Sequence, residues 1–114
     1  MRWLLLGLAA AAAACGSAPP ARREAVAAPS CTTLVSELRR ARTVPGVAAT
    51  ARELRDRYGV DPSLAAQGYA AVVRVRAAAR RAIGDGRPTA ARRMFAEARL
   101  VQLRADALSN DLCP

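Results

Sequence analysis

Apolar residues from Thr32 onward recur three or four positions apart, which is the spacing typical of amphipathic helices. Two short helices are predicted by two apolar stripes, formed by Leu34, Val35, Leu38 and Ala41 and then by Val47, Ala51, Leu54 and Tyr58. Pro45 and Gly46 separate the stripes, and Gly59 is a typical C-terminal stop for the second one. We therefore expect the chain to turn back on itself at Pro45-Gly46.

Two longer helices are predicted beyond this point. Asp61 and Pro62 indicate the start of the third helix, with Asp61 as the N-cap and proline at the first helical position. Its apolar face consists of Ala65, Gly68, Val72, Val75, Ala79 and Ile83. The segment Gly84-Asp85-Gly86 ends this helix, and Pro88 opens the fourth one.

The fourth helix carries apolar residues on two sides. One stripe consists of Ala91, Met94, Phe95, Ala98, Val101, Ala105 and Leu108, and the other of Ala96, Leu100, Leu103 and Ala107. A helix that is apolar on two faces is usually buried between neighbours. We therefore expect the fourth helix at the centre, between the third helix and the two short ones. An alternative use of Leu100 and Leu103 is a dimer interface, which would leave both exposed in a monomer.

These elements predict an all-α fold, a small antiparallel bundle of two short and two long helices over residues 31–114. Cys31 and Cys113 lie near the two ends of this segment. A disulfide requires Cα atoms within about 7 Å, whereas one continuous rod in place of the two short helices would separate the cysteines by about 30 Å. The predicted fold-back brings both to the same end, so we expect a Cys31–Cys113 disulfide. The alternative is two unrelated thiols.

The N-terminus has the features of an export signal. Arg2 precedes the apolar run from Leu4 to Ala14, which is shorter than the roughly 20 residues needed to span a bilayer. We therefore assign residues 1–14 to a cleaved signal peptide. The following segment, residues 15–30, is rich in Pro, Ala and small polar residues and is predicted to be a flexible tether.

The sequence Ala12-Ala13-Ala14-Cys15 resembles the lipobox of bacterial lipoproteins, although that motif usually has Leu at the position of Ala12. The resemblance implies that the Cys15 thiol carries a diacylglyceryl group and anchors the protein to a membrane of the cell envelope. Lipidation of Cys15 would also leave Cys31 and Cys113 as an even pair. The alternative is ordinary cleavage at the same bond, which gives a periplasmic or secreted protein with a free Cys15 thiol.

Charge is the main clue to a partner. The chain has 18 basic and 9 acidic residues and a net charge of +9, which favours anionic partners. Four arginines lie opposite the apolar face of the third helix, namely Arg74, Arg76, Arg80 and Arg81. We regard them as a candidate surface for anionic envelope components, with an ordinary solvated face as the alternative. Nucleic acid is disfavoured, because residues 15–114 contain no array of aromatic side chains for stacking.

Catalytic and metal-binding motifs are not found in the sequence. The chain has no His, which is the commonest general base and metal ligand. The carboxylates of the predicted domain are dispersed among arginines, at Glu37, Glu53, Asp56, Asp61, Asp85, Glu97, Asp106 and Asp111. We therefore expect no enzymatic activity, no metal site and no cofactor.

Residues 72–105 resemble one unit of the tetratricopeptide repeat, a helix-turn-helix of about 34 residues. The resemblance is carried by a turn glycine, two small packing residues and an aromatic residue, namely Gly86, Ala91, Ala98 and Phe95. Ala79 also fits, whereas Ala78 and Ala82 depart from the motif. A repeat would imply protein binding, and a generic alanine-rich helical hairpin explains the same residues. The sequence thus predicts a binding or scaffolding module, or alternatively a soluble protein with a ligand-binding or inhibitory role.

Overall fold

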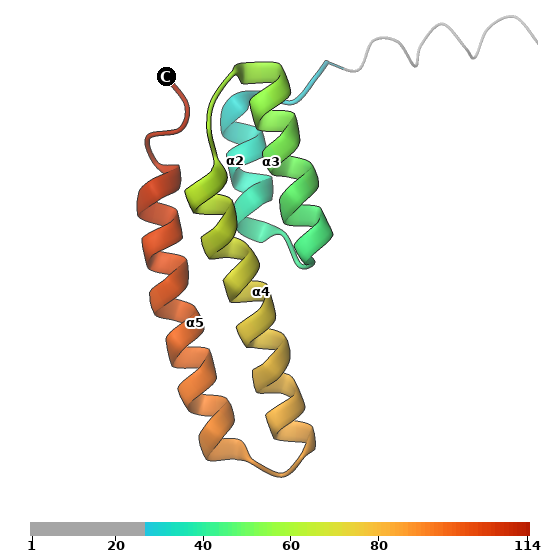
Figure 1. The fold of residues 1–114 in the computed structure, drawn as a ribbon, viewed down its shortest axis with the longest axis vertical. Coiled ribbons are helices and arrows are strands. Elements are labelled where there is room, and N and C mark those ends of the chain that lie inside the picture. Colours follow the sequence, from blue (N-terminus) through green and yellow to red (C-terminus); the bar gives the residue numbers. More distant parts are fainter. Residues whose placement is uncertain (1–26) are drawn as a thin grey trace, which may run out of the picture.

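The computed structural model describes residues 27–114, and this part of the chain is entirely helical apart from turns and termini. The helices are α2 (Cys31–Arg40), α3 (Val44–Tyr58), α4 (Ser63–Gly84) and α5 (Pro88–Ser109). The short helices α2 and α3 form one antiparallel hairpin and the long helices α4 and α5 form another (Figure 1). The predicted all-α bundle of two short and two long helices is therefore confirmed.

The turn between the short helices lies slightly earlier than the sequence predicted. Ala41 caps the end of α2, and Thr43 is the N-cap of α3, with its side chain accepting a 3.0 Å hydrogen bond from the backbone N–H of Gly46. Pro45 lies in the first turn of α3, where its missing N–H costs no helical hydrogen bond. Pro45 and Gly46 thus open the second helix, and the chain reverses over residues 41–43.

The other helix boundaries lie within about one residue of the predicted signals, but the predicted N-cap of the third helix was wrong: α4 begins at Ser63, and its N-cap is Pro62, not Asp61. Gly59 ends α3 with a positive φ of 62°, a conformation that glycine adopts without a steric penalty. At the start of α4, Asp61 Oδ1 accepts hydrogen bonds from the backbone N–H and the hydroxyl of Ser63. These two bonds hold the pKa of Asp61 below its usual value. Pro88 opens α5, as predicted.

The main core forms where α2 and α3 pack against the N-terminal half of α4 (Figure 1). Leu34, Leu38 and Leu54 are completely buried there. Tyr69 of α4 and Ala105 of α5 complete the same cluster. The core cluster, the helix caps and the disulfide of the described residues all lie within residues 29–114.

The contact between α4 and α5 is built from very small side chains. Ala79 of α4 and Ala91, Ala98 and Ala105 of α5 are all buried. The two helices approach closely at Gly68, because a Cβ placed on it would lie 2.8 Å from the Cβ of Ala105. Any larger side chain at Gly68 would therefore push the two helices apart.

The central helix is α4, and the prediction that the fourth helix, α5, is central was wrong. The short hairpin packs on α4, which also contacts α5 along its length. Leu100 and Leu103, the large residues of the second α5 stripe, are 61% and 57% exposed. The error has a physical cause: α4 has small residues on more than one side, so it accepts two neighbours, whereas α5 uses only its alanine-rich side.

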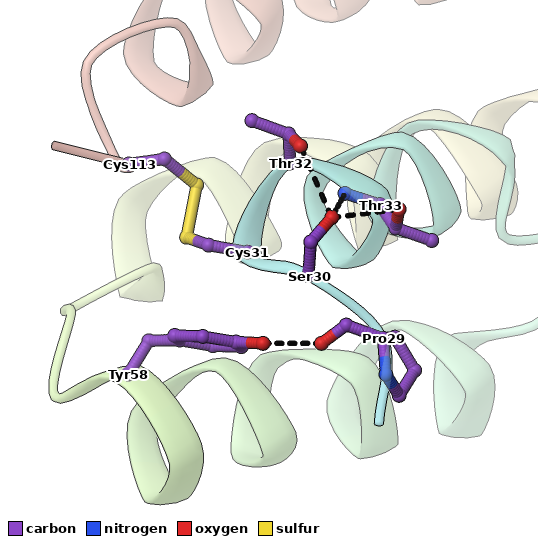
Figure 2. Close-up of a disulfide and its surroundings, with 7 residues drawn as sticks. All are labelled: Pro29, Ser30, Cys31, Thr32, Thr33, Tyr58 and Cys113. Carbon is purple, nitrogen blue, oxygen red and sulfur yellow. Dashed lines mark hydrogen bonds between the residues drawn. A yellow bond between two sulfur atoms is a disulfide. The ribbon is translucent and has the colours of Figure 1, made fainter. Parts of the chain in front are cut away.

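The predicted disulfide is present between Cys31 and Cys113, whose Cα atoms lie 5.9 Å apart (Figure 2). It joins the first residue of α2 to the segment that follows α5. Close to it, Ser30 caps α2 by accepting a hydrogen bond from the Thr33 backbone N–H, and the Tyr58 hydroxyl donates to the carbonyl of Pro29 (Figure 2). The last two residues of the predicted tether are thus held against the domain.

The signal peptide (1–14), Cys15 and most of the tether lie outside the described residues. Among the described helices, none is long and apolar enough to cross a membrane.

The disulfide is expected to supply a large share of the stability. It closes a loop with a sequence separation of 82 residues, for which the chain-entropy relation gives about 4.5 kcal/mol. The double variant C31S/C113S should therefore lose about this much free energy of unfolding in a urea titration. Adding a reductant should destabilise the parent protein by a similar amount and leave the double variant unchanged. Equal stability of parent and variant would contradict the prediction.

Candidate functional site

An arginine-lined cleft of about 550 Å³ lies where the end of α2 meets the middle of α4. Its lining residues are Arg39, Arg40, Ala41, Arg42, Val73, Arg76, Arg80 and Gln102. The end of α2 and the turn after it supply three of the arginines, and α4 supplies the other two. The lining contains no carboxylate. We call this feature the arginine cleft and treat it as the candidate functional site.

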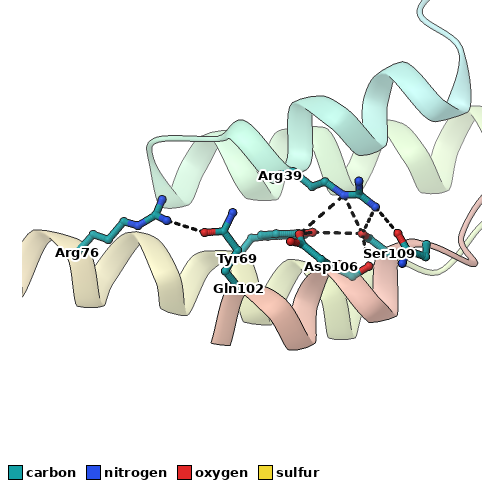
Figure 3. Close-up of polar contacts among 7 residues, drawn as sticks. Arg39, Tyr69, Arg76, Gln102, Asp106 and Ser109 are labelled. Carbon is teal, nitrogen blue, oxygen red and sulfur yellow. Dashed lines mark hydrogen bonds and ion pairs between the residues drawn. The ribbon is translucent and has the colours of Figure 1, made fainter. Parts of the chain in front are cut away.

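Arg39 lines this cleft with a side chain that is held in place by several polar contacts. Its Nε and one terminal nitrogen donate to the Ser109 hydroxyl at 3.1 and 3.0 Å, and the same terminal nitrogen donates to Asn110 at 2.7 Å (Figure 3). Its Nε also lies 3.8 Å from the carboxylate of Asp106. Because these groups on and just beyond α5 already occupy its guanidinium, Arg39 has the least capacity among the five arginines for an additional ligand.

Tyr69 extends this polar network into the core. The side chain is only 2% exposed, and its hydroxyl donates a 2.5 Å hydrogen bond to Asp106 while lying 3.1 Å from the Ser109 hydroxyl (Figure 3). Burial raises the pKa of Tyr69, and the hydrogen bond to Asp106 raises it further. Together with Arg39, these residues connect α2, α4 and α5, and they hold Arg39 in the lining of the cleft.

The remaining arginines are less constrained. Arg76 donates a 2.5 Å hydrogen bond to Gln102 of α5 (Figure 3). Within residues 27–114, the ion pairs are Arg39 with Asp106 and Arg57 with Glu53, so no described carboxylate pairs with Arg40, Arg42, Arg76 or Arg80. These four guanidinium groups are therefore available to an incoming anion.

The clustering of positive charge carries an energetic cost. Like charges four residues apart on a helix, such as Arg76 and Arg80, destabilise it by about 0.2–0.5 kcal/mol. Arg39 and Arg40 are favourably placed at the C-terminal, negative end of the α2 dipole. That explanation does not apply to Arg76 and Arg80, which precede the last turn of α4. A bound anion would relieve the repulsion, because guanidinium groups form strong hydrogen bonds to phosphate and carboxylate.

The structure divides the predicted arginine surface. All four arginines are exposed, but only Arg76 and Arg80 line the cleft. Sequence reasoning missed the contribution of Arg40 and Arg42. Their concentration at the end of a short helix was a visible signal, but its link to α4 depends on how the two hairpins pack.

Metal-binding clusters are absent from the described part of the chain, where no three residues of the His, Cys, Asp or Glu type come together. Comparison of the chain with protein-family models, with curated proteins and with solved structures finds no match. The hairpin of α4 and α5 over residues 72–105 agrees equally with a repeat-like unit and with a generic alanine-rich hairpin.

Removing the Tyr69 hydroxyl should destabilise the domain. Y69F removes the hydrogen bonds of the Tyr69 hydroxyl with Asp106 and Ser109, so we expect a loss of about 1–2 kcal/mol at neutral pH in urea unfolding. The raised pKa means that the folded state favours the neutral phenol. This stabilisation is complete below about pH 10, the pKa of an unfolded tyrosine, and is lost as the pH rises through the folded-state pKa.

The parent protein should accordingly lose more stability than Y69F between neutral and strongly alkaline pH. Y58F is the matched control, because Tyr58 is partly exposed and does not contact the Asp106 network. It should retain the alkaline loss seen in the parent. If Y69F lost as much stability as the parent at alkaline pH, the loss would arise from a group other than Tyr69.

Proposed function

We propose that this protein is an exported, membrane-anchored binding module whose arginine cleft holds an anionic component of the cell envelope. The single observation that carries the proposal is the set of four arginines, Arg40, Arg42, Arg76 and Arg80, that line one cleft without a described carboxylate partner. Binding, rather than catalysis, is the activity that such a set supports best.

The chemistry of the cleft favours a ligand with clustered phosphate or carboxylate groups. Guanidinium groups bind both in a planar, two-pronged geometry. The cleft volume of about 550 Å³ falls within the range of about 300–1,000 Å³ found for small-molecule sites. Arg40 and Arg42 approach from the short hairpin, and Arg76 and Arg80 from α4. A multivalent anion would therefore hold the two hairpins together.

Export and anchoring are supported by two independent features. The first is the signal-like segment that ends at the lipobox-like Ala12-Ala13-Ala14-Cys15. The second is the Cys31–Cys113 disulfide, since such bonds persist mainly in oxidising compartments outside the cytoplasm. The lipid on Cys15 would keep the binding domain close to envelope components at a high effective concentration. Without the lipid, the same domain would be a soluble periplasmic or secreted binder.

The anion site is tested by titrating inorganic pyrophosphate into the purified protein in a calorimeter. R76A/R80A should bind about tenfold more weakly than the parent, because it removes charge-assisted hydrogen bonds from a partly open site. R74A/R81A is the matched control, since it removes the same charge from the same helix outside the cleft. Binding by the parent should weaken with added salt. Equal affinities of the two double variants would contradict the proposed site.

The anchor is tested by intact mass spectrometry of the full-length protein after expression in a bacterium and purification from the envelope fraction. The parent should begin at Cys15 and carry additional acyl mass, whereas C15S should carry none. An unmodified Cys15 in the parent would refute the anchor and favour the soluble alternative. That result would not bear on anion binding at the arginine cleft, which the pyrophosphate titration tests.

A further inference from the structure

The side of α5 that points away from α4 carries an uncovered apolar stripe. The stripe consists of Ala96, Leu100, Leu103 and Ala107, all of which are exposed. Their spacing places them on one side of a helix with about 3.6 residues per turn. The short hairpin does not reach this side of α5, because it packs on α4 (Figure 1). We call these four residues the outer stripe.

Arginines border the outer stripe on both sides. At helical spacing, Arg92 and Arg99 lie along one edge and Arg93 and Arg104 along the other, and all four are exposed. Glu97 is the one exposed carboxylate on α5. Apolar residues flanked by two rows of arginine are typical of helices that lie in the interface of an anionic membrane.

We propose that the outer stripe of α5 docks on the surface of a membrane rich in anionic phospholipid. Leu100 and Leu103 would enter the region between headgroups and acyl chains. The long stems of the flanking arginines would keep their guanidinium groups at the level of the lipid phosphates. The inference does not depend on the arginine cleft, whose α5 residue is Gln102.

The charges favour a membrane over a second copy of this chain. A symmetric dimer through the outer stripe would bring two rows of arginines from one copy against two rows from the other. On α5, each copy has one exposed carboxylate, Glu97, that could offset this repulsion. Lipid phosphates, in contrast, neutralise both rows at once. The observed charge pattern is therefore complementary to an anionic leaflet.

The experiment is co-sedimentation with lipid vesicles. The protein is the chain from residue 15 onward with Cys15→Ser, which contains all the described helices and both cysteines of the disulfide and cannot be acylated at residue 15. Vesicles of equal parts phosphatidylglycerol and phosphatidylcholine should bind it. Its affinity for vesicles of phosphatidylcholine alone should be lower by about tenfold or more. L100Q/L103Q should bind the mixed vesicles about tenfold more weakly than this parent.

Two controls separate this inference from the proposed function. L64Q/I83Q removes two α4 side chains that are 66% and 54% exposed but lie outside the outer stripe, so vesicle binding should not change. R76A/R80A should retain vesicle binding, and L100Q/L103Q should retain pyrophosphate binding. Circular dichroism should show unchanged helical content in every variant, because the substituted side chains are exposed.

Three outcomes would overturn the docking inference. The first is equal binding of L100Q/L103Q and the parent to the mixed vesicles. The second is equal binding of the parent to mixed and neutral vesicles. The third is a parent dimer in analytical ultracentrifugation that L100Q/L103Q converts to a monomer, with no vesicle binding by the parent.

Discussion

The close approach of α4 and α5 determines how the rest of the domain is arranged. Much of the apolar contact is made by alanine, and at Gly68 and Ala105 even one additional methyl group has no room. Such contacts bury little apolar area per residue, and hydrophobic stabilisation scales with that area. Larger side chains on the same helices, including Leu100 and Leu103, therefore stand on other sides and remain exposed. The exposed apolar surface of α5 is thus a consequence of the small side chains in its contact with α4.

Polar and covalent links reinforce the end of the domain where the hairpins meet. Tyr69, Asp106, Ser109 and Arg39 form a network that joins α4, α5 and α2. Within the described residues no buried side-chain nitrogen or oxygen lacks a hydrogen-bond partner, so the network avoids the desolvation penalty of an unpaired group. The same bonds orient Arg39 and thereby connect the stability of the core with the shape of the arginine cleft.

Local signals in the sequence were sufficient for the number and approximate bounds of the helices. Gly59 and Pro88 each impose a local geometric requirement, whereas the Cys31–Cys113 pair followed from the predicted fold-back of the short helices. The choice of central helix was not accessible in this way, because α4 and α5 both have small or apolar residues on more than one side. Of the cleft, the sequence analysis identified Arg76 and Arg80 but not Arg40 and Arg42. These two pairs share one cleft only because of how the hairpins pack.

The Cys31–Cys113 bond makes the folded domain a covalent ring, and the turn between α4 and α5 lies at the opposite end of the molecule (Figure 1). Asp85, Gly86 and Arg87 in that turn are exposed, and exposed turns of small and polar residues are preferred sites of proteolytic cleavage. A single cut there would produce two chains, one containing Cys31 and the other Cys113. The sulfur bond would still hold α5 to the fragment that bears the N-terminus, so release of α5 would require a reductant as well as a protease.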